Sequence, residues 1–101
     1  CREEIRDLTG YLFGHAGDGN IHVHVMDEPQ NPQRWARVEE ATSRIVRQAL
    51  AFEGTCTGEH GVGIGKIRFL EAEHGESLAL MKKLKTLLDP DNLFNPGKIF
   101  L

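Results

Sequence analysis

Two short stretches of the sequence combine glycine with side chains that can bind metals or move protons. Residues 14–22 read GHAGDGNIH, and residues 54–63 read GTCTGEHGVG. Glycine allows positive φ angles and a close approach of the backbone to a ligand, so both stretches are typical of loops that build a site. The alternative is that they are two tight turns with no further role.

The histidines of the first stretch, His15 and His22, are candidate metal ligands. A divalent metal needs imidazole nitrogens at about 2.0–2.1 Å from one point, and a hairpin can bring two such rings together. Asp18 could add a carboxylate oxygen or accept a ring N–H, although stabilising the turn is its more common role. Spacing alone leaves two interpretations open: a metal-binding pair, or two histidines on an ordinary surface.

The second stretch adds a carboxylate and a proton acceptor. Glu59 could be a third ligand, which would give a two-histidine, one-glutamate site suited to Zn²⁺, Fe²⁺ or Mn²⁺ and able to polarise a hydroxyl or carboxylate oxygen. His60 is a good proton acceptor because imidazole titrates near neutral pH. Adjacent loop residues point in different directions, so Glu59 could hold a metal while His60 faces a substrate. Otherwise Glu59 is simply exposed and His60 caps a helix.

Two other motifs in this region are weaker. Gly65-Lys66 resembles the end of a phosphate-binding loop, but His60 stands where the first glycine is required, and Ile67 stands where serine or threonine is required. Cys56 could be a nucleophile, but a small cysteine in a short loop is more often a packing residue. Neither motif supports a separate function.

The first stretch is predicted to connect two strands of a β-hairpin. Residues 20–26 alternate isoleucine and valine with His22, His24 and a methionine, which is the period-two pattern of a strand with two different faces. Residues 8–13 form the expected partner strand, and the residues between the two strands are typical of turns. His22 and His24 therefore share one face of the predicted sheet.

A long helix is predicted to follow the hairpin. Asn31 suits the N-cap and Pro32 the first helical position, and Gly54 is expected to end the helix as a left-handed cap. One face of this helix is predicted to be apolar. Its members are Val38, Ala41, Ile45, Ala49 and Phe52.

Two shorter helices are predicted after the second stretch. Residues 66–74 form one, which ends at Gly75, and residues 76–88 form the other, which Asp89-Pro90 closes. The last helix carries apolar residues on one side, and these are expected in the core. They are Leu78, Met81, Leu84 and Leu88.

Length and composition exclude several classes of protein. The 101 residues allow one domain at most. A net charge of −3 with no basic stripe argues against nucleic acid as a partner, and no apolar run approaches the roughly 20 residues of a membrane span. Two cysteines fit a reducing compartment better than a disulfide framework, and no targeting segment is visible. Because the chain opens at Cys1 within a polar run, we expect a fragment of something longer.

Three ordered motifs together resemble the C-terminal domain of the FAD-linked oxidases, which are vanillyl-alcohol-oxidase-type flavoproteins. The motifs are residues 14–22, residues 54–63 and DPDNLFNPGKI at residues 89–99. The group includes D-lactate dehydrogenase, the glycolate oxidase catalytic subunit and D-2-hydroxyglutarate dehydrogenase. The resemblance implies an α+β fold, namely a fragment of a ferredoxin-like cap domain in which a portion of antiparallel sheet is covered by helices.

The resemblance also implies a reaction, in which a D-2-hydroxy acid such as D-lactate or glycolate is oxidised to the 2-oxo acid with hydride transfer to FAD. By this resemblance His15, His22 and Glu59 hold a divalent metal of the Zn²⁺ type, which binds the hydroxyl and carboxylate of the substrate. His60 is implied to be the base that removes the hydroxyl proton.

Two further residues take roles from the resemblance. His24 stands where the 2-hydroxyglutarate-type enzymes carry asparagine, so it could be an extra ligand, a plain strand residue or a substrate contact; we favour the substrate contact. Asn95 lies in the turn that returns to the flavin domain and is expected to contact the cofactor. Residues 1–101 are then the C-terminal cap or substrate domain, with the FAD-binding domain absent. Such a piece is expected to be inactive alone and to self-associate.

Two alternatives belong to other functional classes. In a small metallohydrolase, His15, His22 and Glu59 would activate water, and the chain alone would be active. In a non-catalytic metal-binding or assembly module, replacing His60 with alanine would leave the function intact. The expected location is the cytoplasm, with peripheral membrane attachment through partner subunits as an option, or mitochondria for a eukaryotic source. The electron acceptor stays open.

Overall fold

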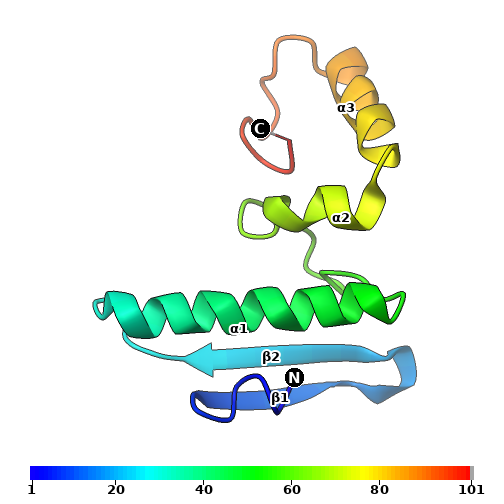
Figure 1. Cartoon of the computed structure of the whole chain (residues 1–101). Coiled ribbons are helices and arrows are strands. Elements are labelled where there is room, and N and C mark those ends of the chain that lie inside the picture. Colours follow the sequence, from blue (N-terminus) through cyan, green and yellow to red (C-terminus); the bar gives the residue numbers. More distant parts are fainter. Residues whose placement is uncertain (101) are drawn as a thin grey trace. The chain divides into compact units, whose positions relative to one another are not determined.

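The computed structural model describes residues 1–100, which form two compact units (Figure 1). The first unit, Cys1–Glu53, contains a β-hairpin and a long helix, and the second unit begins at Gly54 and contains two shorter helices. One antiparallel two-stranded sheet and three α-helices confirm the predicted α+β class. No helix among the described residues is long and apolar enough to cross a membrane.

The hairpin pairs β1 (Thr9–His15) with β2 (Asn20–Met26). β2 has the predicted bounds, whereas β1 lies further along the chain than residues 8–13 and includes His15 in the ladder, opposite Asn20. A single 3₁₀ turn, η1 (Ala16–Asp18), connects the strands. Gly19 ends this turn with a φ of 66°, a left-handed conformation that glycine adopts without strain.

Helix α1 (Pro32–Ala51) runs alongside the hairpin within the first unit (Figure 1). It begins as predicted: the Asn31 side chain accepts a hydrogen bond from the backbone N–H of Arg34, and Pro32 is the first helical residue. The buried apolar side chains of this unit form its core. They are Ile5, Val38, Ala41 and Val46.

The end of α1 differs from the prediction. The helix stops at Ala51, and Glu53 rather than Gly54 takes the left-handed conformation, with a φ of 61°. Phe52 was expected on the buried face but is 77% exposed. The chain leaves helical geometry before the apolar pattern ends, so the pattern predicts an end of α1 that is later than the observed one.

The segment before β1 is fixed to α1 by Arg37. Its guanidinium donates to Asp7 Oδ1 at 2.7 Å and to the backbone oxygen of Glu4 at 2.9 Å. The hydrogen bond from Arg37 holds the pKa of Asp7 below its usual value. Ile5 lies over Gly10, where an added Cβ would come within 2.8 Å of the Ile5 Cδ1 atom. Polar and apolar contacts therefore anchor the same segment.

In the second unit, η2 (Ile67–Phe69) and α2 (Leu70–His74) form the predicted short helical region, and α3 (Ser77–Leu88) forms the last helix. Gly75 separates α2 from α3 with a φ of 50°. Cys56, Phe69 and Leu70 are buried. The order and approximate bounds of these helices confirm the prediction.

The predicted core role of α3 is wrong for the residues described. No residue of this helix is buried; Leu84 is 49% exposed and Leu88 is 78% exposed, while Leu78 and Met81 are half-buried. A helical repeat of apolar residues defines one side of a helix, but burial also needs a surface that packs against that side.

The C-terminal segment is held on the end of α3 by the buried Asp89. Its carboxylate accepts the backbone N–H groups of Leu93 at 2.8 Å and Phe94 at 2.9 Å, and it pairs with the ammonium of Lys85. The hydrogen bond from Lys85, together with the two backbone bonds, lowers the pKa of Asp89. An irregular segment thus obtains a fixed conformation without regular secondary structure.

Candidate metal centre

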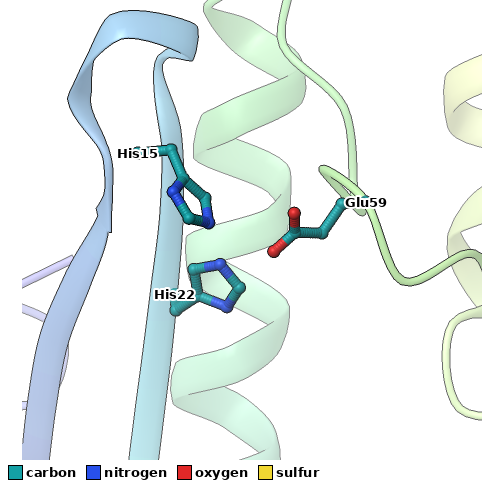
Figure 2. Close-up of side chains that lie close together, drawn as sticks. All are labelled: His15, His22 and Glu59. Atoms are coloured by element: carbon teal, nitrogen blue, oxygen red, sulfur yellow. The ribbon is translucent and has the colours of Figure 1, made fainter.

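His15 and His22 lie close together on the hairpin, as the sequence predicts. Their ring centroids are 5.5 Å apart, with the rings in an edge-to-face arrangement (Figure 2). His15 is exposed and His22 is half-buried. They reach this arrangement from opposite strands, because Phe13 pairs with His22 and His15 pairs with Asn20.

Gly14 allows the two strands to come close beside these histidines. A Cβ atom built on Gly14 would lie 2.0 Å from the backbone oxygen of Asn20, far inside any real contact. Only glycine therefore fits this backbone at this position. Gly14 is therefore required by the close approach of the two strands, which the sequence alone did not specify.

Phe13 organises the ring-bearing face of the hairpin. Its ring stacks on His22 with centroids 4.9 Å apart and contacts the edge of His24, also at 4.9 Å. His24 shares the face of His22, as predicted. Phe13 belongs to the strand predicted over residues 8–13, and no role beyond the strand was expected for it. No sequence signal pointed to this contact, because it depends on the pairing register, which places Phe13 opposite His22 in the structure.

Glu59 and His60 lie in the loop between α1 and η2, at the tip of a turn closed by threonine side chains. The Thr57 hydroxyl donates to the backbone oxygen of Gly61 at 3.1 Å. His60 Nε2 is 3.6 Å from Glu59 Oε1. The two side chains therefore lie closer together than expected for adjacent loop residues that point in different directions. Gly61, with a φ of 75°, lets the backbone curve tightly here. Figure 2 draws the Glu59 carboxylate on this loop.

Cys56 is a packing residue in the same loop. Its thiol is buried, and burial together with the nearby Glu73 carboxylate raises its pKa to about 11. A thiol with that pKa is protonated near neutral pH, whereas the thiolate is the nucleophilic form. The Cys56 backbone N–H donates to Glu73 Oε2 at 3.0 Å. No motif in the sequence marked Glu73.

Asn95 lies in the turn that the sequence predicts near the C-terminal end. It is exposed, has a φ of 48°, and its backbone oxygen accepts the N–H of Lys98 at 3.2 Å. The following residue, Ile99, donates its N–H to the backbone oxygen of Gly63 at 2.8 Å. The turn is therefore tied to the end of the second glycine-rich stretch, while a contact of Asn95 with a cofactor stays a prediction.

The donor types in the two stretches fit a divalent cation. His15 and His22 each offer an imidazole nitrogen and Glu59 offers a carboxylate oxygen. Two nitrogens and one oxygen form a ligand set of the kind that Zn²⁺ and related ions bind with positions left open for a substrate.

Comparison with known proteins defines the family. The family "FAD linked oxidases, C-terminal domain" matches residues 1–99, and the chain belongs to it. The chain is 48% identical to a probable mitochondrial D-lactate dehydrogenase of Danio rerio over 94 residues, and 44% identical to glycolate oxidase subunit GlcD of Bacillus subtilis over 95 residues. It is 37% identical to a D-2-hydroxyglutarate dehydrogenase of Xanthomonas citri pv. viticola over 97 residues.

These matches cover nearly all of this chain but a small part of each relative. They include 92%, 93% and 93% of this chain and 19%, 20% and 21% of the three relatives. The chain thus spans about one fifth of the length of the curated relatives it matches. The resemblance predicted from the three sequence motifs is confirmed.

Proposed function

We propose that this chain is the C-terminal cap or substrate domain of an FAD-dependent enzyme that oxidises a D-2-hydroxy acid, of the D-lactate or glycolate type, to the 2-oxo acid. The observation that carries the proposal is the family match over residues 1–99. Three relatives named for D-lactate, glycolate and D-2-hydroxyglutarate share a 2-hydroxy acid as the common chemistry. Family membership favours this function over a small metallohydrolase.

We further propose that His15, His22 and Glu59 hold one divalent cation of the Zn²⁺ type. When bound, such an ion would polarise the substrate hydroxyl and lower its pKa. The hairpin supplies two imidazoles, whose spacing the strand pairing fixes. Glu59 supplies the negative charge that offsets part of the charge of the cation, and the substrate carboxylate would offset the rest.

His60 is the proposed base. Its imidazole would take the proton of the substrate hydroxyl, and the hydride on the carbon that bears this hydroxyl would have a bound FAD as its acceptor. Glu59 Oε1 lies 3.6 Å from His60 Nε2, so the proposed base stands beside the proposed carboxylate ligand. His24, beside Phe13, is proposed to contact the substrate, and Asn95 to contact the cofactor.

The location of the protein and the self-association of this chain are also proposals. Relatives from Danio rerio and Arabidopsis thaliana are named as mitochondrial, so a mitochondrial location is proposed if the source is eukaryotic. Self-association of the 101-residue chain is proposed because Leu87, Leu88 and Phe94 are 76%, 78% and 69% exposed. Light scattering tests this, and a monomer at high concentration would contradict it.

The central experiment follows flavin bleaching in the protein that carries this chain. We expect bleaching by a panel of D-2-hydroxy acids, no bleaching by their L-enantiomers, and loss of bleaching after treatment with a chelator. His60→Gln should slow bleaching by about 10²–10⁴-fold with substrate binding retained. Bleaching by none of the acids would contradict the substrate class, and an unchanged rate in His60→Gln would favour a non-catalytic module.

A matched variant tests the metal proposal. Glu59→Gln keeps the shape of the side chain but removes its charge, and it should lower the affinity for Zn²⁺ measured by calorimetry. Glu76→Gln removes an exposed carboxylate from the same unit, at the N-cap of α3, and should leave the affinity unchanged. Equal losses in both variants would mean that overall charge, not a specific ligand, governs binding.

A further inference from the structure

We propose that Glu73 is a positioning residue for the loop that carries Glu59 and His60. Its carboxylate holds the start of that loop by accepting the backbone N–H of Cys56. Hydrogen bonds from side chains within the loop then connect this fixed point to the segment of Glu59 and His60. The inference rests on the proposed function of Glu59 and His60, and it adds to that function a residue that contacts neither substrate nor metal.

The anchor is a partly buried contact between α2 and the loop. The side chain of Glu73 is only 11% exposed, and its Oε2 atom accepts the Cys56 N–H at 3.0 Å. Cys56 is itself 6% exposed and lies three residues before Glu59. A backbone N–H buried in irregular structure needs an acceptor, and here a side chain supplies it in place of a strand or helix partner.

The chemistry of Glu73 points to a specific role rather than to simple packing. Burying a carboxylate is unfavourable unless it is hydrogen-bonded, so an apolar residue would fill this position at lower cost. Burial acts to raise the pKa of Glu73, but the hydrogen bonds from Cys56, together with the charges of His74 and Lys66, outweigh it, and the net pKa is lowered. Glu73 is therefore ionised near neutral pH, and an ionised acceptor forms the stronger hydrogen bond.

Side-chain hydrogen bonds connect this anchor to the tip of the loop. On either side of Cys56, the Thr55 hydroxyl donates to the backbone oxygen of Thr57 at 2.8 Å, and the Thr57 hydroxyl donates to that of Gly61 at 3.1 Å. Glu59 and His60 lie inside the second of these two bridges. A change in the position of Cys56 is therefore transmitted to both functional side chains.

The first test compares three variants of the protein that carries this chain by calorimetric titration with Zn²⁺. Glu73→Ala should weaken binding by about tenfold, the range found when a group supporting a metal ligand is lost. Glu73→Gln keeps an acceptor oxygen of the same shape without the charge and should recover most of the affinity. Glu71→Ala removes an exposed carboxylate of the same helix and should bind like the wild type.

The second test does not depend on metal. Amide hydrogen exchange of residues 56–61 should accelerate about tenfold in Glu73→Ala and about threefold in Glu73→Gln, with the hairpin amides and Glu71→Ala unchanged. Unchanged exchange in this loop, or acceleration spread evenly over the whole unit, would overturn the inference. If Glu73→Ala fails to fold, the exchange of Glu73→Gln decides by the same criterion.

The two tests separate the inference from the proposed function. If the wild-type protein binds no Zn²⁺, the proposed metal site fails, while the exchange measurement still judges the role of Glu73. If the wild type binds Zn²⁺ and both Glu73 variants bind equally well, the positioning role is wrong and the metal site stands.

Discussion

The two glycine-rich regions hold their functional side chains by different means. On the hairpin, His15 and His22 belong to paired strands, and a ladder of backbone contacts over the whole of β1 and β2 sets their spacing. In the second region, Glu59 and His60 lie in irregular structure, and a few side-chain hydrogen bonds set their position.

This difference indicates where each region is sensitive. A ladder has many equivalent backbone hydrogen bonds, so the loss of one side chain leaves the register intact. A steric clash between the strand backbones, in contrast, disrupts the pairing itself. A loop with few anchors tolerates changes in open space but responds to the loss of any anchor. The hairpin is therefore expected to respond most to backbone clashes, and the loop to the loss of single hydrogen bonds.

The largest effect is expected at the close approach of the strands. Gly14→Ala would place a Cβ 2.0 Å from the Asn20 oxygen and should destabilise the chain by about 2–3 kcal/mol in urea unfolding. Gly17→Ala is the matched control, because an added Cβ there meets nothing within 4 Å, and its effect should stay within about 0.5 kcal/mol. Equal effects would show that the strand approach is not the constraint.

Acid should weaken the hydrogen bonds that Asp89 accepts in the second unit, but not the backbone hydrogen bonds of the hairpin. The folded pKa of Asp89 is lowered, so its contribution to stability is complete above the ordinary value of 3.8 and is lost as the pH falls through the folded pKa. The amide NMR signals of Leu93 and Phe94, which donate to Asp89, should shift below pH 3.8, while that of Val23 in β2 stays constant.

Asp89→Asn is the control for the acid titration. It removes the ionisable group, so the shift of the Leu93 and Phe94 signals with acid should disappear. A shift that persists in this variant would assign the titration to another carboxyl, such as Glu73, whose pKa is also lowered.

A smaller effect is expected for the hydrogen bond that closes the loop. Thr57→Val keeps the shape of the side chain but removes the donor to the Gly61 oxygen. The free energy of Zn²⁺ binding should weaken by about 1 kcal/mol, which is about fivefold in affinity. Thr86→Val removes a similar hydroxyl bond, to the Lys82 oxygen on α3, and should leave the affinity unchanged. Weaker Zn²⁺ binding in both variants would contradict a specific role of the loop closure.

The smallest effect is expected for a side chain on the ladder. Phe13→Leu removes the ring that stacks on His22, which should lower the free energy of unfolding by about 0.5 kcal/mol. It should change Zn²⁺ affinity by less than about threefold, because the strand register still positions His22. Tyr11→Leu, opposite His24, serves as the control. A larger loss of affinity in Phe13→Leu would mean that the ring, and not the register, positions His22.

The local features of the fold were predictable from the sequence. The alternation over residues 20–26 gave the bounds of β2, and Asn31 with Pro32 gave the start of α1, because both signals depend only on neighbouring residues. The candidate histidines of the hairpin were predictable for the same reason, since a short turn brings together the strands on either side of it.

Other features were not predictable, because they depend on contacts between distant segments. The left-handed residue after α1 is Glu53 and not Gly54, and Leu84 and Leu88 of α3 are exposed rather than buried. Glu73 lies 17 residues from Cys56, and no pattern in the sequence joins them. Propensity and periodicity describe one element at a time and carry no information about its neighbours.

The order of the three motifs was enough, by itself, to determine the family and the side chains worth testing. The tertiary structure alone decided which glycine allows the strands to approach, which ring contacts both His22 and His24, and which carboxylate accepts the Cys56 N–H ahead of Glu59 and His60. The physical reason is that residue types limit the available chemistry, whereas distances between atoms of separate segments arise only when the chain packs.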